Sequence, residues 1–546
     1  METEGHASSQ GSVVMQGALT IGLAATNLIT TAVAQKVVKF DIQGRAPSEA
    51  VKLVRRATIR ENLFNDVNEG LYSVNVSIGT PPQNFQLQLD TGSTDIWVNS
   101  ADSEFCRQGN CYDSFSSSNS SSYRVSVSNE FNVTYGDGTG AAGDLFTDDL
   151  VVGDVTLTNQ TMGLATTSDI AYGLMGVGMV GTEGSCGAVE GPAYCYPNVL
   201  DSMVSEGKIN SHAFSLYLND LNQSTGSILF GGVDSSRYSG DLVSVPMVGI
   251  PLLNGSTEDD RYTVAWTNFT ITTPRGIETF LQEDINVPAL LDSGTTLAVL
   301  PEQIYRLILE QMGAVELEGG AFAPCYLRVA NATIDFHVGG PTGFIFSIPL
   351  REFLFDLDSE TARLFHDLGG AQYCQVGLQA GDDLPIFGDV ILRSAYIVYD
   401  LDNRQIALAQ ANFSPGAANI KEITNGTTSN IPGVARTASA ISSLSSVTSA
   451  TAAVHTSLQS SRTGSPSTAS IVPLASFTTA SYTGQNGYTA MSSITTSAPS
   501  GTGASSSSSS SGAASAVTVP RFSVEKPFIV GMISMLVAVG AGMILS

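Results

Sequence analysis

The segment FQLQLDTGSTDIWV at residues 85–98 is the most informative part of the chain, because a short apolar run leads directly into Asp90-Thr91-Gly92-Ser93. The segment PALLDSGT at residues 288–295 repeats this plan around Asp292. The two aspartates are about 200 residues apart, which is the length of one domain. An apolar pair followed by glycine recurs later in each half, at residues 174–176 and 386–388. The repeat predicts a body made of two related halves.

The chemistry of this pattern is that of two carboxyl groups brought into contact. Such groups cannot both ionise cheaply, so they share one proton. The ionised group can then act as a general base on water, and the protonated group as a general acid toward a carbonyl oxygen. We therefore predict Asp90 and Asp292 to be a catalytic pair that hydrolyses peptide bonds at acidic pH. The predicted supporting residues are Thr91, Gly92, Ser293 and Gly294.

At these motifs the chain resembles the pepsin-like aspartic proteases, and most closely the fungal GPI-anchored, yapsin-like members, over residues 69–413. Residues 90–98 are similar to the first active-site segment of that family, and residues 386–393 to the segment behind the second aspartate. The resemblance implies a substrate-binding flap at Tyr135, Gly136 and Asp137, with Trp97 as the hydrogen-bonding support of the flap tyrosine. It also implies that Ser93 and Thr295 supply outer hydroxyls that support catalysis by bonding the two carboxylates. It also implies an all-β, bilobal fold, with two related β lobes and a central active-site cleft.

Asp137 bears on specificity. In fungal relatives an acidic residue at this flap position is associated with cleavage after lysine, since a carboxylate there would stabilise a cation. The alternative is that Asp137 only serves the turn, because Asp-Gly is favoured in hairpins. The sequence departs from the family pattern at Ser293, where threonine is also common, and in having an additional cysteine pair, 186/195.

The pattern between residues 69 and 413 predicts strands. Short alternating apolar runs are separated by turn signals such as Gly-Thr-Pro-Pro. One short helix is predicted from Pro301 to Met312. The expected strands are 71–78, 84–89, 132–135, 215–218, 227–230 and 395–400. We expect an N-terminal lobe at residues 69–245 and a C-terminal lobe at residues 246–413.

Composition excludes several classes of function. The 546-residue chain has a formal net charge of −26, which opposes binding to nucleic acid phosphates. Its five histidines show no metal-binding spacing, and the nucleophile elbow of serine hydrolases is absent. We expect no metal and no cofactor, peptide or protein substrates, and a monomer.

Six cysteines indicate an oxidising compartment. Their spacing favours Cys106–Cys111, Cys186–Cys195 and Cys325–Cys374, although six cysteines permit 15 pairings. Ten N-x-S/T triplets also agree with secretion. These features predict a disulfide-bonded glycoprotein of the secretory pathway.

The ends of the chain read as targeting segments. Residues 1–34 end in an A-x-A pattern and are interpreted as a signal peptide, with Met1 or Met15 as the start and a core helix as the alternative. Residues 35–68 hold a basic cluster, interpreted as a propeptide or, alternatively, a solvated arm. Residues 414–526 read as a disordered Ser/Thr-rich stalk. Residues 527–546 are interpreted as a GPI-anchor signal or, alternatively, a tail-anchored helix. The anchor candidates are Ser511, Gly512 and Ala513, and the destination is the plasma membrane or cell wall.

Two rival functions come from other classes. An actin-like phosphotransferase also uses D-x-G-[ST] turns, but it needs abundant helices and a reducing cytosol. A non-catalytic surface adhesin on a protease scaffold would share the stalk and anchor. Hydrolysis of peptides, and its loss in Asp90→Asn, separates the adhesin from a protease.

Overall fold

A computed structural model describes the chain at residues 71–179, 181–186, 194–221, 225–252, 255–280, 285–317, 320–357, 362, 372–381, 384–424, 431–441 and 443–445, and at residues 38–44 by backbone alone. The chain divides into Met1–Gln35 and Lys36–Ser546, and every described residue belongs to the second unit. The signal peptide predicted at 1–34, the anchor signal predicted at 527–546 and the anchor candidates Ser511, Gly512 and Ala513 lie outside the described residues.

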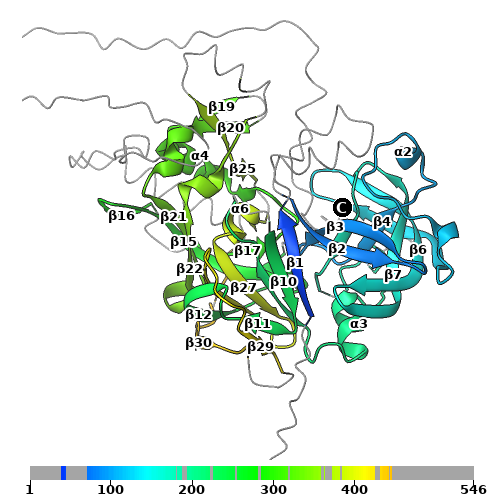
Figure 1. Cartoon of the computed structure of the whole chain (residues 1–546). Coiled ribbons are helices and arrows are strands. Elements are labelled where there is room, and N and C mark those ends of the chain that lie inside the picture. The colour runs from blue at the N-terminus through cyan, green and yellow to red at the C-terminus, as the bar shows by residue number, and fades with distance from the viewer. Residues whose placement is uncertain are drawn as a thin grey trace, which may run out of the picture. The chain divides into compact units, whose positions relative to one another are not determined.

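Strands dominate the regular structure (Figure 1). In the first half they are β1 (Val38–Gly44), β2 (Tyr72–Ile78), β3 (Gln83–Asp90), β4 (Ile96–Asn99), β5 (Arg124–Thr134), β6 (Gly140–Val152), β7 (Val155–Ser168), β8 (Leu174–Gly176), β9 (Ala213–Tyr217), β10 (Thr225–Phe230), β11 (Gly232–Asp234) and β12 (Tyr238–Pro246). In the second half they are β13 (Ile250–Pro251), β14 (Thr257–Glu258), β15 (Thr263–Thr273), β16 (Gly276–Thr279), β17 (Val287–Leu291), β18 (Ala298–Leu300), β19 (Val315–Leu317), β20 (Gly320–Pro324), β21 (Thr333–Val338), β22 (Phe344–Pro349), β23 (Leu354–Phe355), β24 (Tyr373–Val376), β25 (Leu378–Ala380), β26 (Ile386–Phe387), β27 (Ala395–Asp400), β28 (Gln405–Ala411), β29 (Ile420–Glu422) and β30 (Val434–Thr437).

Helices in the described part of the chain are short. They are α2 (Glu104–Arg107), α3 (Val199–Ser205), α4 (Glu302–Met312) and α6 (Asp389–Leu392), with 3-10 turns at Ser117–Asn119, Cys325–Val329, Gly340–Thr342 and Leu350–Phe353. The predicted helix is confirmed as α4, which has Pro301 at its N-cap and ends at Gly313 in the left-handed conformation. The all-β class is confirmed.

Two large sheets carry the fold. A 14-stranded sheet runs in the order β30-β12-β28-β27-β9-β10-β1-β2-β3-β8-β4-β7-β6-β5. An 8-stranded sheet runs β22-β21-β15-β17-β26-β18-β25, and its eighth strand, β16, pairs with β15 off this path. Strand β6 shows why the sequence forms strands here, because its residues alternate between buried and half-buried positions. Strand β27 is buried along its whole length, as expected for a strand covered on both faces. In the 14-stranded sheet β9 pairs with β27, so strands from the two halves of the chain lie side by side.

The repeat predicted from the sequence is a repeat of structure. In the first half β8 pairs with β3 in parallel and with β4 in antiparallel orientation. In the second half β26 pairs with β17 in parallel and with β18 in antiparallel orientation. Each aspartate motif therefore follows a strand that is braced by the apolar-glycine segment of its own half. A Cβ on Gly176 would meet the backbone carbon of Thr94 at 2.6 Å, and one on Gly388 would meet the carbonyl oxygen of Leu297 at 2.1 Å, so both positions require glycine.

Strand β1 falls in the range predicted as propeptide. It lies between β10 and β2, and it is antiparallel to both. Figure 1 shows it in dark blue beside β10. The segment 38–44 is thus a strand of the 14-stranded sheet.

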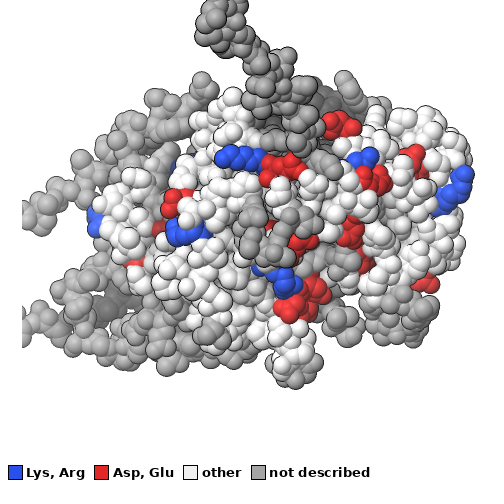
Figure 2. Space-filling view, turned by 90° about the horizontal axis from the view of Figure 1, so that it is seen from below, with Lys and Arg blue, Asp and Glu red and all other residues white. Residues whose placement is uncertain are grey.

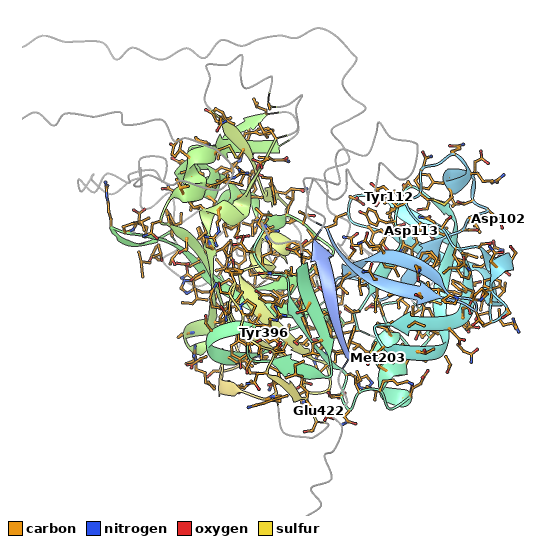
Figure 3. All side chains as sticks on the ribbon, in the orientation of Figure 1. Asp102, Tyr112, Asp113, Met203, Tyr396 and Glu422 are labelled. Carbon is orange, nitrogen blue, oxygen red and sulfur yellow. A yellow bond between two sulfur atoms is a disulfide. The ribbon has the colours of Figure 1, made fainter. Side chains whose placement is uncertain are left out.

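Ordered structure continues past residue 413, where the sequence interpretation begins the stalk. Strand β29 pairs with β11, and β30 pairs in parallel with β12. Glu422 of β29 (Figure 3) accepts a hydrogen bond from the side chain of Asn210. Ile423 and Ile431 are buried against the body, 1% and 3% exposed. The boundary at 413 is therefore too early. The Ser/Thr-rich composition hid a few apolar residues that suffice to dock the chain.

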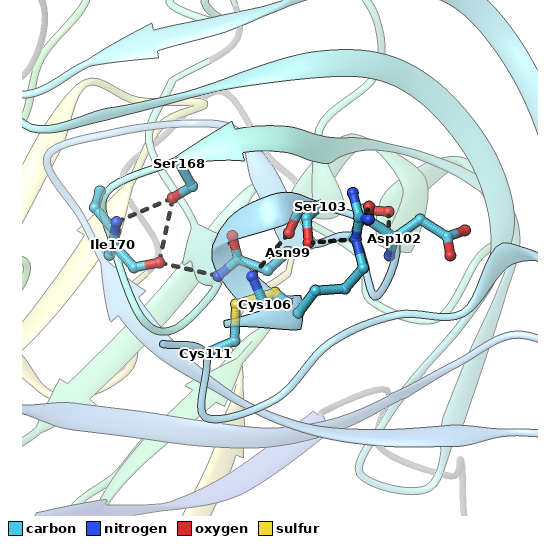
Figure 4. Close-up of a disulfide and its surroundings, with 9 residues drawn as sticks. Asn99, Asp102, Ser103, Cys106, Cys111, Ser168 and Ile170 are labelled. Atoms are coloured by element: carbon cyan, nitrogen blue, oxygen red, sulfur yellow. Dashed lines mark hydrogen bonds between the residues drawn. A yellow bond between two sulfur atoms is a disulfide. The ribbon is translucent and has the colours of Figure 1, made fainter. Parts of the chain in front are cut away.

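All three predicted disulfides are present, Cys106–Cys111, Cys186–Cys195 and Cys325–Cys374. The first closes a turn around α2, where the backbone N–H of Cys106 donates to Oγ of Ser103 at 3.1 Å (Figure 4). No helix among the described residues is long and apolar enough to cross a bilayer.

Candidate active site

Asp90 is the last residue of β3, and Asp292 directly follows β17. Both side chains are fully buried, at 0% exposure, and each lies close enough to shift the pKa of the other. The structure thus brings together two carboxyl groups that come from equivalent places in the two halves of the chain.

Each carboxylate receives the same two donors. The backbone N–H of Gly92 donates to Oδ1 of Asp90 at 2.7 Å, and the hydroxyl of Ser93 donates to Oδ2. In the second half the N–H of Gly294 donates to Oδ1 of Asp292 at 2.8 Å, and Oγ1 of Thr295 donates to Oδ2 at 2.7 Å. The outer hydroxyls implied by the family resemblance, Ser93 and Thr295, therefore lie in matching positions.

The inner hydroxyls tie the two loops to one another. Oγ1 of Thr91 donates to the carbonyl oxygen of Leu291 at 2.9 Å, and Oγ of Ser293 donates to that of Leu89 at 3.0 Å. The N–H of Ser293 also donates to Oγ1 of Thr91 at 2.9 Å. These reciprocal bonds hold the two carboxyl groups in register across the joint.

A further cross-link between the halves was not anticipated from the sequence. Gln88 lies two residues before Asp90 on β3 and is only 2% exposed. Its Nε2 donates to the carbonyl oxygen of Gly294 at 3.0 Å, whereas its Oε1 has no partner among the described residues. The available signal was that Gln88 shares the strand face of Asp90, since residues two apart in a strand point to the same side. The equivalent residue of the second half is the apolar Leu290.

Burial and mutual charge set the titration of the pair. Burial raises the pKa of Asp90, against the lowering effect of its donors Ser93 and Gly92. Burial and the charge of Asp90 raise the pKa of Asp292 well above its usual range. Because the groups are in contact, the titration belongs to the pair, and one proton is held between them over a range of acidic pH.

The segment Tyr135–Thr139 forms a hairpin turn near this pair. The N–H of Tyr135 donates to the carbonyl oxygen of Thr139 at 2.8 Å, and Gly138 has a φ of +84°. Nε1 of Trp97 donates to the hydroxyl of Tyr135 at 2.8 Å, as the resemblance implied. Burial and then the charge of Asp90 raise the pKa of Tyr135 well above its usual range, so its hydroxyl stays neutral. The turn also holds Gly136.

Asp137 is half-buried in the same turn. Its Oδ1 accepts from the N–H of Thr139 at 2.9 Å and from the hydroxyl of Thr139 at 2.7 Å. One carboxylate oxygen is therefore used by the hairpin itself. The interpretation of Asp137 as a turn residue accounts for these two bonds, and a role in recognition would fall to its other oxygen.

Three further ionisable side chains are buried near the catalytic candidates, namely Asp389, Arg393 and Glu352. Asp389 begins α6 and is 0% exposed, and neither carboxylate oxygen has a hydrogen-bond partner among the described residues. Its N–H donates to the carbonyl oxygen of Thr295 at 2.8 Å, which places it against the second catalytic loop. Burial raises the pKa of Asp389 well above its usual range despite the nearby Arg393. Arg393 in turn donates to Glu352 at 2.9 Å, with both side chains fully buried.

One group of potential metal ligands lies elsewhere in the described residues, at Glu183, Cys186 and Cys195. Both sulfur atoms belong to a disulfide, so neither can offer a thiolate. This cluster therefore lacks the chemistry of a metal centre.

Comparison with known families agrees with this geometry. The family model described as "Eukaryotic aspartyl protease" matches residues 71–411, which is more than half of the chain. The chain belongs to this family, and it is an aspartic-type endopeptidase, a hydrolase of peptide bonds.

Individual relatives are fungal. The chain is 38% identical over 405 residues to the probable aspartic-type endopeptidase opsB of Aspergillus fumigatus, covering 72% of this chain and 80% of that protein. It is 32% identical over 413 residues to the aspartic proteinase yapsin-3 of Saccharomyces cerevisiae, covering 74% and 78%. The crystal structure of the aspartic proteinase from Irpex lacteus matches with a TM-score of 0.51 at 21% identity, covering 70% of this chain and 100% of that one. This last likeness shows the fold. The phosphotransferase alternative is excluded by the family.

Proposed function

We propose that Asp90 and Asp292 are the catalytic pair of this endopeptidase. The supporting observation is that two fully buried carboxyl groups, each held by two donors, lie close enough to shift the pKa of one another. A water between them loses a proton to the ionised carboxylate while its oxygen attacks the carbonyl carbon of the scissile peptide. The protonated carboxyl gives its proton to the carbonyl oxygen. When the tetrahedral intermediate collapses, one of its hydroxyls returns a proton to the carboxylate that had acted as the acid. The carbon–nitrogen bond breaks, and the leaving nitrogen takes the proton held by the base.

Replacing either acid tests the assignment and separates a protease from the adhesin alternative. Asp90→Asn and Asp292→Asn keep the size of the side chain but remove the shared proton. We expect each variant to lose about 10³-fold or more in kcat/KM on an unstructured peptide, because general acid and base act together. Unchanged hydrolysis by both variants would refute the pair. The wild type hydrolysing no peptide at acidic pH would favour the adhesin.

Tyr135, Gly136 and Asp137 are proposed to cover an extended peptide bound in a cleft between the lobes. The Trp97 hydrogen bond fixes the ring of Tyr135, and a hairpin braced in this way can exclude water from the scissile bond. Tyr135→Phe removes only the hydroxyl. It should lower kcat/KM by about 10-fold, the scale of one lost hydrogen bond, while the melting temperature falls little.

A preference for basic residues before the cleaved bond is also proposed, through Asp137. Its Oδ1 is held by Thr139, which would aim Oδ2 toward a substrate cation. Matched peptides with Lys or Leu at that position test this. Asp137→Asn keeps the turn acceptor and removes the charge, so it should lower the Lys/Leu ratio of kcat/KM by about 10-fold, as expected for a charge-assisted bond. Thr139→Val is the control for the turn, and an equal effect on the ratio would overturn the role of the charge.

We further propose that the protein is secreted as a zymogen and tethered to the cell surface as a monomer. Support comes from three disulfides, ten N-glycosylation triplets and the basic segment 35–68, from which β1 enters the main sheet. The proposal also includes a signal peptide at residues 1–34, a Ser/Thr-rich stalk before residue 527 and a GPI signal at residues 527–546. Phosphatidylinositol-specific phospholipase should release activity from cells, and deletion of 527–546 should send it to the medium. Activity that stays with cells after both treatments would contradict the anchor.

A further inference from the structure

Asp95 is a buried carboxylate that the hydrolytic mechanism does not use. It lies five residues after Asp90 and is only 3% exposed. The hydroxyl of Tyr196 donates to its Oδ1, and the backbone N–H of Gly184 donates to its Oδ2 at 2.8 Å. Both oxygens of a buried side chain are therefore held by a different part of the chain.

The two donors come from the two ends of one disulfide-closed loop. Gly184 stands two residues before Cys186, and Tyr196 directly follows Cys195. Two more bonds join the same ends, from Oγ of Ser185 to the carbonyl oxygen of Tyr194 at 2.6 Å, and from the N–H of Tyr194 to the carbonyl oxygen of Ser185 at 3.0 Å. The disulfide thus keeps both donors within reach of the single carboxylate.

The position of Asp95 connects this loop to the catalytic residues. Two residues earlier, Ser93 donates to the carboxylate of Asp90, and two residues later, Trp97 donates to Tyr135 of the flap. The carbonyl oxygen of Asp95 also accepts from the N–H of Gly176 at 3.0 Å. A displacement of Asp95 would therefore move both the hydroxyl on the first aspartate and the support of the flap tyrosine.

We propose that Asp95 is a positioning residue for the peptidase reaction, held in place by Tyr196 and Gly184, and that the Cys186–Cys195 disulfide makes this hold effective. The inference rests on the proposed function of Asp90 and Tyr135. Glu183 of the same loop is also buried, and its Oε2 accepts a hydrogen bond from the N–H of Gly181 at 2.9 Å. The activity is accordingly sensitive to reduction at one disulfide of the N-terminal half and insensitive at the other.

Tyrosine substitutions provide the first test. Tyr196→Phe removes the hydroxyl bound to Asp95, whereas Tyr194→Phe alters an exposed ring of the same loop whose hydrogen bonds are made by its backbone. We expect Tyr196→Phe to lower kcat/KM by about 10-fold, the scale of one lost bond to a charged group. KM should rise with the loosened flap, and Tyr194→Phe should match the wild type. Equal kinetics of the two variants would overturn the proposal.

Reduction provides the second test, on the full purified chain. Cys186→Ser/Cys195→Ser should show the lowered kcat/KM without reductant and no further loss with it. Cys106→Ser/Cys111→Ser should have wild-type kinetics and keep the reductant-sensitive step. Wild-type kinetics for the first pair of substitutions would refute the role of the disulfide. Melting temperatures of all variants distinguish a loss of folding from a displaced Asp95. The kcat/KM of Asp95→Asn, which retains one acceptor, should lie between those of the wild type and Asp95→Ala.

The variant Asp90→Asn distinguishes a failure of the positioning role of Asp95 from a failure of the proposed catalytic function. If it abolishes hydrolysis while Tyr196→Phe behaves as Tyr194→Phe does, only the positioning role is wrong. If Asp90→Asn remains active, the proposed function itself is wrong.

Discussion

Gln88 of the first half donates to the carbonyl oxygen of Gly294 in the loop that carries Asp292, at 3.0 Å. Gly294 itself donates to Asp292 through its N–H, and the next residue, Thr295, donates through its hydroxyl. The side chain of Gln88 is thus bonded to the glycine that supplies one donor to Asp292 and directly precedes the residue that supplies the other.

Replacing Gln88 should therefore disturb catalysis more than folding. We expect Gln88→Leu to lower kcat by about 10-fold, the scale of one lost hydrogen bond. Its pH–rate profile should move toward higher pH, because the donors that lower the pKa of Asp292 become looser. Steady-state kinetics at several pH values measure this, with the exposed Gln108→Leu as control. A profile identical to wild type would show that Gln88 only fills space.

Stability should fall as pH rises from acidic to neutral. Burial raises the pKa values of Asp90, Asp292 and Asp389 above those of the unfolded chain. Such groups stabilise the fold below the unfolded pKa of about 4, and this contribution is lost as pH rises through the folded pKa values. Urea titrations should give a lower free energy of unfolding at pH 7 than at pH 4. Asp292→Asn should flatten this dependence, and an unchanged slope in that variant would exclude the pair as its source.

The buried ion pair of Glu352 and Arg393 should be costly to break from one side. Both side chains are 0% exposed, and Nε of Arg393 donates to Oε2 of Glu352 at 2.9 Å. Glu352→Ala leaves an unpaired buried guanidinium, for which a loss of about 3–5 kcal/mol in the free energy of unfolding is expected. The control Glu302→Ala removes the exposed partner of Arg306 and should have little effect. Comparable losses in the two variants would contradict the importance of burial.

His212 lies between two carboxylates, with Nε2 at 3.2 Å from Asp201 and Nδ1 at 2.8 Å from Asp402. The hydrogen bond with Asp201 is the largest cause that raises the pKa of His212 to about 9. Stability from the charged ring is therefore fully present below its unfolded pKa of about 6.5, and it is lost as pH rises through 9. The difference in unfolding free energy between wild type and His212→Gln should be largest at pH 6 and vanish above pH 10. A difference independent of pH would indicate packing instead of charge.

The sequence was sufficient for features that depend on local pattern. The catalytic candidates follow apolar strands in two copies, the four cysteines of the first half pair with near neighbours, and α4 has Pro301 at its N-cap, as the sequence indicates. Figure 2 shows acidic side chains with basic ones beside several of them. The sequence gives the excess of acidic over basic residues, but not which of them lie side by side. Salt bridges such as Arg436 with Asp241 need the fold to be known.

Long-range polar contacts could not be predicted in this way. The bonds of Gln88 to Gly294 and of Tyr196 to Asp95 join residues about 200 and about 100 positions apart, and no periodicity encodes such pairs. The docking of β30 was missed for a different reason. The buried apolar residues beside it, Ile431 and Ala438, stand in a Ser/Thr-rich background, where average composition favours disorder.

Strand β30 closes one end of the 14-stranded sheet. It has only four residues, and Arg436 at its centre reaches to the carbonyl oxygens of Thr342 and Gly343. Without it, the longer β12 would present a row of free amide and carbonyl groups, an edge on which a neighbouring molecule could add a strand. A short charged strand gives a poor template for such growth. The segment that carries β30 thus covers one edge of the sheet, on which a second copy of the body could otherwise add a strand.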